Sequence, residues 1–152
     1  MPSTKPLFSS LLLVTTLLLI TSMTYQRRIT SLDYRIQMAL RNPQPILLPL
    51  TEVFPASGST VSVEDLRLRY PGGACFYLEN PIQDLISKEV HLLINDENLF
   101  FWTGEPAILT TVDDWGYCFL NIKFVPGNYL FDLTVEELGI DHYQWAFTFT
   151  DN

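Results

Sequence analysis

The sequence lacks the short motifs by which many hydrolases and metal-binding domains are identified. It contains no G-x-S-x-G, no H-E-x-x-H, no C-x-x-C and no D-x-D-x-D-G run. These spacings matter because they bring nucleophiles, bases or metal ligands together in one turn or on one helix face. The only metal-ligand types outside the carboxylates are Cys75, Cys118, His91 and His142, and no spacing among them indicates zinc. We therefore expect no enzymatic activity, no cofactor and no metal.

The sequence also lacks any N-x-S/T sequon and has only two cysteines. The missing sequon predicts no N-glycosylation and favours a bacterial exported protein over a eukaryotic surface protein. Cys75 and Cys118 lie 43 positions apart in stretches that look like strands. We treat them as a candidate disulfide between the two sheets of a sandwich, and two buried free thiols are the alternative.

Positive charge is scarce outside the first part of the chain. Residues 1–42 hold five basic residues against Asp33 alone, a net charge of +4, whereas residues 43–152 carry a net charge of −12. An acidic body would repel phosphates, which excludes nucleic acid as a partner. The basic beginning lies beside an apolar run and is suited to an anionic membrane surface.

The apolar run covers residues 6–26, which contain no charged residue. Its strongly apolar part is just long enough to cross a bilayer as a helix, for which about 20 residues are needed. The small residues that a signal peptidase requires are poorly matched, so we expect an uncleaved anchor over residues 1–25, and a cleaved signal segment is the alternative. The arginines that follow would draw the body towards the cytoplasm. The acidic composition and the candidate disulfide instead favour a single-pass cell-membrane protein whose C-terminal domain lies outside the cytoplasm.

An amphipathic helix is predicted over residues 26–42. Its apolar residues, together with Tyr25 just before it, recur at steps of three and four and are Ile29, Leu32, Ile36 and Leu40. We expect this stripe to lie on lipid or on its own domain, and self-association through residues 25–40 is the alternative. The helix should end before Pro43, and residues 43–49 form a proline-rich linker to the domain at 50–152.

Residues 50–152 alternate between apolar and polar residues, which predicts strands with one wet face. The alternating stretches are 65–70, 89–94, 118–124, 129–136 and 143–150, and shorter β-rich stretches include "CFYLEN", "LFFWT" and "AILTTV". Turn sequences such as "PGG", "NDEN" and "PGN" separate them. The pattern predicts an all-β fold, an antiparallel β-sandwich of seven or eight strands.

Three stretches resemble bacterial immunoglobulin-like (Ig-like) domains over about residues 50–151. They are "FPASGSTVSVEDLRLRY", "LISKEVHLLINDENLF" and "VPGNYLFDLTVEELGIDHYQWAFTF". The first resembles the opening strands of such domains, and the last resembles their closing pair. The resemblance implies a single membrane-anchored Ig-like domain with a role in adhesion, scaffolding or spacing. Tyr129, after Pro126 and Gly127, would be a tyrosine corner whose hydroxyl bonds to the backbone of the preceding turn.

Aromatic residues supply the binding candidates. Trp102 lies in "LFFWTGE", and Trp115 and Tyr117 lie in "DDWGYCF". Alternation turns some of these rings outward, where they would offer a flat surface to a glycan or an envelope protein. Packing into the ends of the sandwich is the alternative. Carboxylates also gather at three predicted turns, which we interpret as solvated turns and not as calcium sites: Asp96–Glu97, Asp113–Asp114, and Glu136–Glu137 with Asp141.

The sequence therefore predicts a membrane-tethered, non-enzymatic Ig-like binding or assembly module of the cell envelope. A minor-pilin-like subunit of a type IV pilus or secretion system is the first alternative, since that class also joins an apolar helix to a β-rich body. A small envelope enzyme is the second. His91 is expected on the polar face of its strand, and His142 in a loop before the last strand.

Overall fold

A computed structural model describes residues 5–69, 73–80, 82, 85, 89–99, 104, 108–112 and 116–151, and the side chains of residues 5–11 and 67–69 are not described. The chain divides into two compact units, Met1–Tyr34 and Arg35–Asn152. The second unit begins earlier than residue 50, where the sequence placed the start of the domain.

The second unit is built on two β-sheets. The four-stranded sheet has the order β1-β3-β7-β6, and the five-stranded sheet has the order β2-β9-β8-β4-β5. The strands of the first sheet are β1 (Leu50–Phe54), β3 (Ala74–Leu78), β6 (Leu109–Val112) and β7 (Gly116–Phe119). Those of the second are β2 (Thr60–Ser62), β4 (Val90–Ile94), β5 (Glu97–Asn98), β8 (Gly127–Val135) and β9 (Ile140–Thr150).

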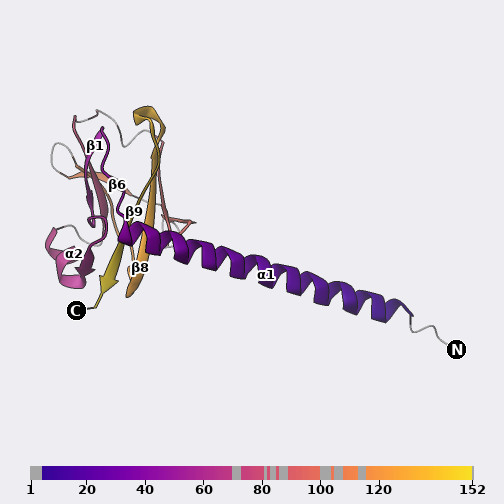
Figure 1. The fold of residues 1–152 in the computed structure, drawn as a ribbon. Coiled ribbons are helices and arrows are strands. Elements are labelled where there is room, and N and C mark those ends of the chain that lie inside the picture. Colours follow the sequence, from indigo (N-terminus) through magenta and orange to yellow (C-terminus); the bar gives the residue numbers. More distant parts are fainter. Residues whose placement is uncertain are drawn as a thin grey trace. The chain divides into compact units, whose positions relative to one another are not determined.

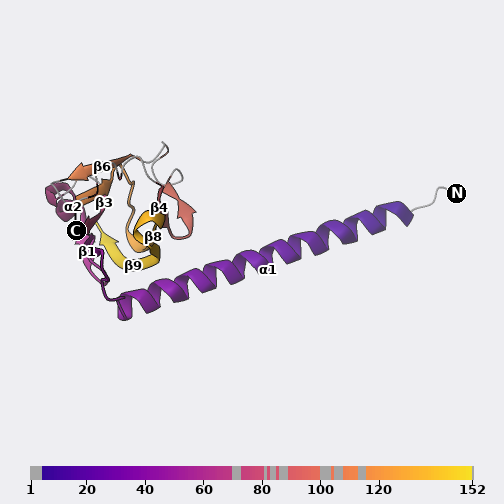
Figure 2. The same ribbon diagram turned by 90° about the horizontal axis from the view of Figure 1, so that it is seen from above.

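The two sheets face each other as the layers of a β-sandwich (Figures 1 and 2). Alternate residues of the long strands point into one apolar core, which holds Phe131 and Trp145 in edge-to-face contact, with ring centroids 5.0 Å apart. Phe76 and Phe119 reach the same core from the four-stranded sheet. The predicted β-sandwich is thus confirmed, although the described part of the chain holds nine strands where seven or eight were predicted.

The strand predicted over residues 65–70 is wrong, because residues Val63–Arg69 form helix α2. Ser62 and Asp65 form a reciprocal cap at its start: the Asp65 carboxylate accepts the backbone N–H of Ser62 at 2.9 Å, and the Ser62 hydroxyl accepts the N–H of Asp65 at 3.2 Å. A capping box of this kind satisfies the first N–H groups of a helix. The local cap outweighs the apparent alternation in "DLRLRY".

Two other sequence predictions need correction. The strand predicted over 118–124 ends with β7 at Phe119, and Asn121 then adopts a left-handed φ of 63°, which an extended strand does not accommodate. The sheets are also not purely antiparallel, because β2 pairs parallel to β9. The predicted strands over 129–136 and 143–150 correspond to β8 and β9, which pair antiparallel along most of their length.

Helix α1 (Lys5–Arg41) has 37 residues and ends before Pro43, as predicted. Its hydroxyl side chains donate hydrogen bonds to backbone carbonyls three or four residues earlier in the helix. The donors are Thr15, Thr16, Thr21, Ser22 and Thr24. Among the described residues, no helix combines the length and the apolarity that a membrane crossing requires.

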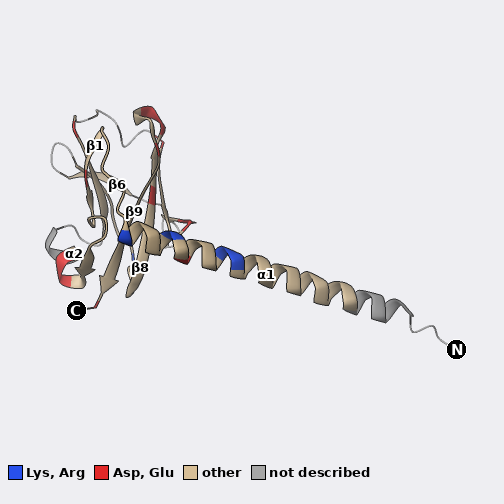
Figure 3. Ribbon diagram, viewed as in Figure 1, with Lys and Arg blue, Asp and Glu red and all other residues tan. Residues whose placement is uncertain are grey.

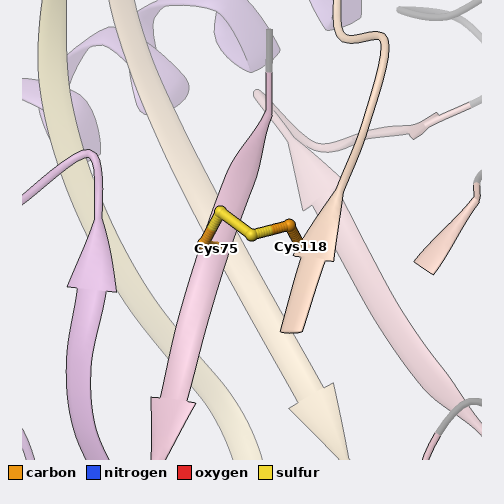
Figure 4. The surroundings of a disulfide bond; sticks show 2 residues. All are labelled: Cys75 and Cys118. Atoms are coloured by element: carbon orange, nitrogen blue, oxygen red, sulfur yellow. A yellow bond between two sulfur atoms is a disulfide. The ribbon is translucent and has the colours of Figure 1, made fainter. Parts of the chain in front are cut away.

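Cys75 and Cys118 form a disulfide, so the predicted bridge is confirmed (Figure 4). Its position differs from the prediction, because the two residues face each other on the neighbouring strands β3 and β7 of one sheet. Their Cα atoms are 4.0 Å apart, the close spacing of directly opposed residues in an antiparallel pair. The bond therefore pins two strands within the four-stranded sheet and does not join the two layers.

Tyr129 makes the contacts of a tyrosine corner. Its hydroxyl donates to the carbonyl of Val125 at 2.6 Å and accepts the N–H of Val125 at 2.9 Å. Burial is the main cause that raises the pKa of this phenol, and the backbone hydrogen bond partly offsets it. The hydroxyl thereby satisfies both polar groups of one residue in the irregular segment before β8.

Replacing Tyr129 by Phe should lower the free energy of unfolding by about 1–2 kcal/mol, because the backbone of Val125 loses its partner. Urea denaturation of the full chain in detergent micelles measures the effect. Tyr34→Phe is the matched control, since that ring is exposed. Equal midpoints for Tyr129→Phe and the parent would contradict the role of the hydroxyl.

Removing the disulfide should lower the free energy of unfolding more than Tyr129→Phe does. Changing both Cys75 and Cys118 to Ala opens a loop of 43 residues. Chain-entropy arguments give a loss of about 3–4 kcal/mol for a loop of this size. The comparison is made by denaturation of the parent with and without reductant beside the double variant. If reductant destabilises the double variant as much as the parent, the loss of stability in reductant does not come from the Cys75–Cys118 bond.

Candidate functional site

Of the three aromatic residues that the sequence predicts as a binding surface, only Tyr117 is among the described residues. Trp102 and Trp115 lie outside the described residues. Tyr117 is 3% exposed and stacks on Phe76, with ring centroids 5.5 Å apart. Its hydroxyl donates to the carbonyl of Ile82 at 2.8 Å and accepts the N–H of the same residue at 3.2 Å. The ring of Tyr117 is therefore part of the core and offers no surface to a ligand, which corrects its assignment as a binding residue.

A different site lies on the outer face of the five-stranded sheet. On β8 and β9, Leu130 and Ala146 face each other and are buried, yet they do not belong to the core between the sheets. Ile36, near the end of α1, is the other buried apolar residue of the described chain that lies outside that core. This pattern indicates that a further layer covers part of the outer face.

Residues 35–49 supply that cover. A single guanidinium nitrogen of Arg35, Nη1, donates to both carboxylate oxygens of Asp96 at the β4–β5 turn, each at 2.8 Å. Gly58 donates its N–H to the carbonyl of Ala146 at 2.7 Å and lies against Pro43. Gln44 accepts the N–H of Gln144 through its side-chain carbonyl at 3.3 Å. The segment 35–49, which we call the strap, thus contacts β9 and the β4–β5 turn, and Ile36 is the one buried residue of the predicted apolar stripe among those described.

Asp132 lies on the same outer face and is 7% exposed, the one buried charged residue among those described. Its carboxylate accepts the side-chain amide of Gln144 at 2.6 Å and faces Nδ1 of His142 at 3.0 Å. A buried carboxylate is costly unless its oxygens are hydrogen-bonded, and here two side chains on the neighbouring strand provide the bonds.

A β-bulge aims His142 at this carboxylate. Leu133 pairs with Tyr143 and Val135 pairs with Ile140, so two residues of β9 lie opposite Thr134 alone. His142 occupies the bulge with a φ of 51°, in the left-handed region that non-glycine residues seldom adopt. Bulges and strained residues of this kind are frequent at functional sites. His142 is thus a residue of β9, and not of the loop in which the sequence placed it.

Asp132 also sets the electrostatics of the imidazole. The hydrogen bond that the Asp132 carboxylate accepts, and then its charge, raise the pKa of His142. Asp141 adds to this rise, while burial and Arg35 act in the opposite direction. The His142 side chain is 66% exposed, so it exchanges protons freely with solvent. Its second nitrogen, Nε2, lies 3.8 Å from Oδ1 of Asp141.

The exposed side of His142 borders a hollow of about 270 Å³. Two elements line it: the strap with β1, and the beginning of β9. The lining residues are Gln44, Leu47, Leu48, Leu50, Gly139, Ile140, Asp141, His142 and Tyr143. Burial raises the pKa of Tyr143, whose hydroxyl has no hydrogen-bond partner among the described residues. The hollow combines exposed leucines on one side with an oriented imidazole and a carboxylate on the other.

An imidazole oriented by a carboxylate can bind a ligand or act as a base. Thr134 accepts the backbone N–H of His142 through its hydroxyl at 3.4 Å. Within the described ranges, no three His, Cys, Asp or Glu side chains gather closely enough to hold a metal ion. Figure 3 shows acidic residues at the turn between β8 and β9. Gly139, at the end of this turn, and Asp141, at the beginning of β9, line the hollow.

The other predicted acidic turns differ in whether their carboxylates have a partner or are exposed. Asp96 belongs to the two-residue turn between β4 and β5 and is engaged by Arg35. Glu136 and Glu137 are exposed at the 3-10 turn η2 (Glu136–Leu138), while Asp113 and Asp114 lie outside the described residues. His91 is exposed on β4, as expected.

Comparisons with known proteins reveal no relative at the sequence level: no family model and no curated protein matches the chain. Two solved structures are similar in fold. CopC from Methylosinus trichosporium OB3b is 10% identical with a TM-score of 0.45, over 68% of this chain and 93% of CopC. The LD transpeptidase LdtMt1, solved in complex with imipenem, is 15% identical with a TM-score of 0.41, over 69% of this chain and 40% of the transpeptidase. At these values neither similarity carries an argument about function.

The His142–Asp132 pair predicts a definite pH dependence of stability. Because the folded-state pKa is raised above the unfolded value of 6.5, the folded chain holds the proton more tightly. The stabilisation is therefore complete below pH 6.5 and is lost as the pH rises through the folded-state pKa. His142→Gln should destabilise the chain most in mildly acidic solution and less above neutrality.

Urea denaturation at a series of pH values tests this, with His91→Gln as the control for loss of an exposed imidazole elsewhere on the sheet. A difference between His142→Gln and the parent that is constant with pH would show that the imidazole contributes only by packing.

Proposed function

We propose that the chain is a non-enzymatic, Ig-like binding or assembly module that an N-terminal helix tethers to the cell membrane. The β-sandwich provides the body, and the hollow beside His142 provides a site on it. The observation that carries the tether is the composition of α1: residues 6–26 contain no charge, and the described side chains from Leu12 to Ile20 include large exposed apolar residues. The proposal rests on the apolar composition of all of residues 6–26, although the side chains before residue 12 are not described.

The hydroxyl groups within this run support the same proposal. In hydrocarbon each polar group must find a partner within the protein, because no water is present to solvate it. The described hydroxyls from Thr15 to Thr24 all donate to carbonyls of their own helix. Serine and threonine therefore add little cost to burying this helix in lipid.

The disulfide supports a body outside the cytoplasm. Disulfides persist in oxidising compartments and are rare in the reducing cytosol. The bond between Cys75 and Cys118 lies in the core, where both residues are fully buried. This favours export over the cytoplasmic orientation that the arginines after the run would promote.

Alkaline extraction of membranes tests the tether. An arginine in the middle of a spanning helix costs about 2.5–3.5 kcal/mol, so Leu18→Arg should move the full chain from the membrane pellet towards the supernatant. Ile29→Arg adds the same charge outside the apolar run and should stay with the parent in the pellet. Protease added outside spheroplasts should then digest residues 43–152.

Equal extraction of Leu18→Arg and the parent would contradict insertion of the run. A body that resists protease until the membrane is broken would contradict only the proposed side of the membrane.

A further inference from the structure

The hollow beside β9 has two chemically different walls. Leu47 and Leu48 of the strap line one wall and are 67% and 70% exposed, unusually open positions for leucine. His142 and Asp141 line the other. A ligand that fills both parts needs an apolar stem and a polar head.

The imidazole presents an acceptor to this hollow. The carboxylate of Asp132 can only accept a hydrogen bond, so Nδ1 of His142, 3.0 Å away, carries a proton. In the neutral imidazole the lone pair then lies on Nε2, the nitrogen nearer to Asp141, which also lines the hollow. Oδ1 of Asp141 is 3.8 Å from Nε2, which gives two acceptors side by side. One ammonium or guanidinium group can donate to both.

The charge of the body favours a cationic head. Residues 43–152 carry a net charge of −12, and Asp141 and Glu136 are exposed next to the hollow. A field of one sign steers oppositely charged partners to the surface and repels acidic ones. Lysine and arginine also join a charged head to an apolar stem, which they commonly lay on apolar surface.

We propose that the hollow binds a lysine or arginine side chain of a basic partner protein, with the stem on Leu47 and Leu48 and the head on His142 and Asp141. This gives a partner class to the binding role proposed above, and it does not require the membrane tether. The charged groups that face His142 are Asp132 on β8, Asp141 on β9 and Arg35 on α1. Protons compete with the cation, because protonated His142 loses its acceptor on Nε2.

The test uses the full chain in detergent micelles and four small probes: the Nα-acetyl amides of arginine, lysine, norleucine and glutamate. The imidazole resonances of His142 report binding by NMR. We expect saturable shifts with arginine and lysine and none with norleucine or glutamate, and weaker binding of both cations in acidic solution. Norleucine keeps the stem without the head, so it separates charge recognition from apolar contact.

Variants locate the site. Asp141→Asn should weaken binding of the arginine probe about tenfold, the loss expected for one charge-assisted hydrogen bond. Leu48→Ser should weaken it as well, whereas Glu97→Gln removes one negative charge from the same sheet away from the hollow and should not. The probe series on the parent decides the question even where a variant fails to fold.

Absence of a saturable shift with both cations would overturn the proposal, as would equal shifts with norleucine or glutamate. Equal weakening by Glu97→Gln and Asp141→Asn would also overturn it, because the attraction would then be non-local. Since the membrane tether is tested by extraction, either idea can fail without the other.

Discussion

The antiparallel pairing of β8 and β9 is the constraint on which the rest of the second unit depends. One face of this pair places Phe131 and Trp145 in the core between the sheets. The opposite face carries Leu130, Ala146 and Asp132, which no sandwich layer covers. Because each side chain on a strand takes the face opposite to its neighbour, one register decides both surfaces. The outer face of the pair therefore also holds buried side chains, and the strap over residues 35–49 contacts the same sheet through Arg35 and Gln44.

Polar contacts join the outer face of the five-stranded sheet to the strap. Gln144 links the layers, since its side chain donates to Asp132 and its backbone N–H donates to Gln44 of the strap. Arg35 fixes the beginning of the strap through Asp96. Removing one partner of a buried charge leaves the other unsatisfied, which costs more than the bond contributes when complete. The buried carboxylate of Asp132 is thus tolerated because His142, at the bulge, and Gln144 both form hydrogen bonds with it.

Sequence patterns predicted the parts of this fold that depend on neighbouring residues. The alternation in β8 and β9, the end of α1 before Pro43 and the corner made by Tyr129 are all readable over a few positions. The same alternation misled over 65–70, where a capping box from Ser62 and Asp65 starts α2. The site at Asp132 was not predicted, because alternation assigned that residue to solvent. Its partners, His142 and Gln144, lie ten and twelve residues later on the neighbouring strand, and the bulge that brings His142 to it leaves no local signal.

The strap also contributes residues to the hollow. A boundary at the prolines would keep both sheets but would remove Gln44, Leu47 and Leu48, which form one wall of the hollow. It would also remove the acceptor for the backbone N–H of Gln144, whose side chain donates to Asp132. The hollow therefore belongs to residues 35–152 as a whole and not to the sandwich alone. A segment that composition marks as a linker serves here as part of the site.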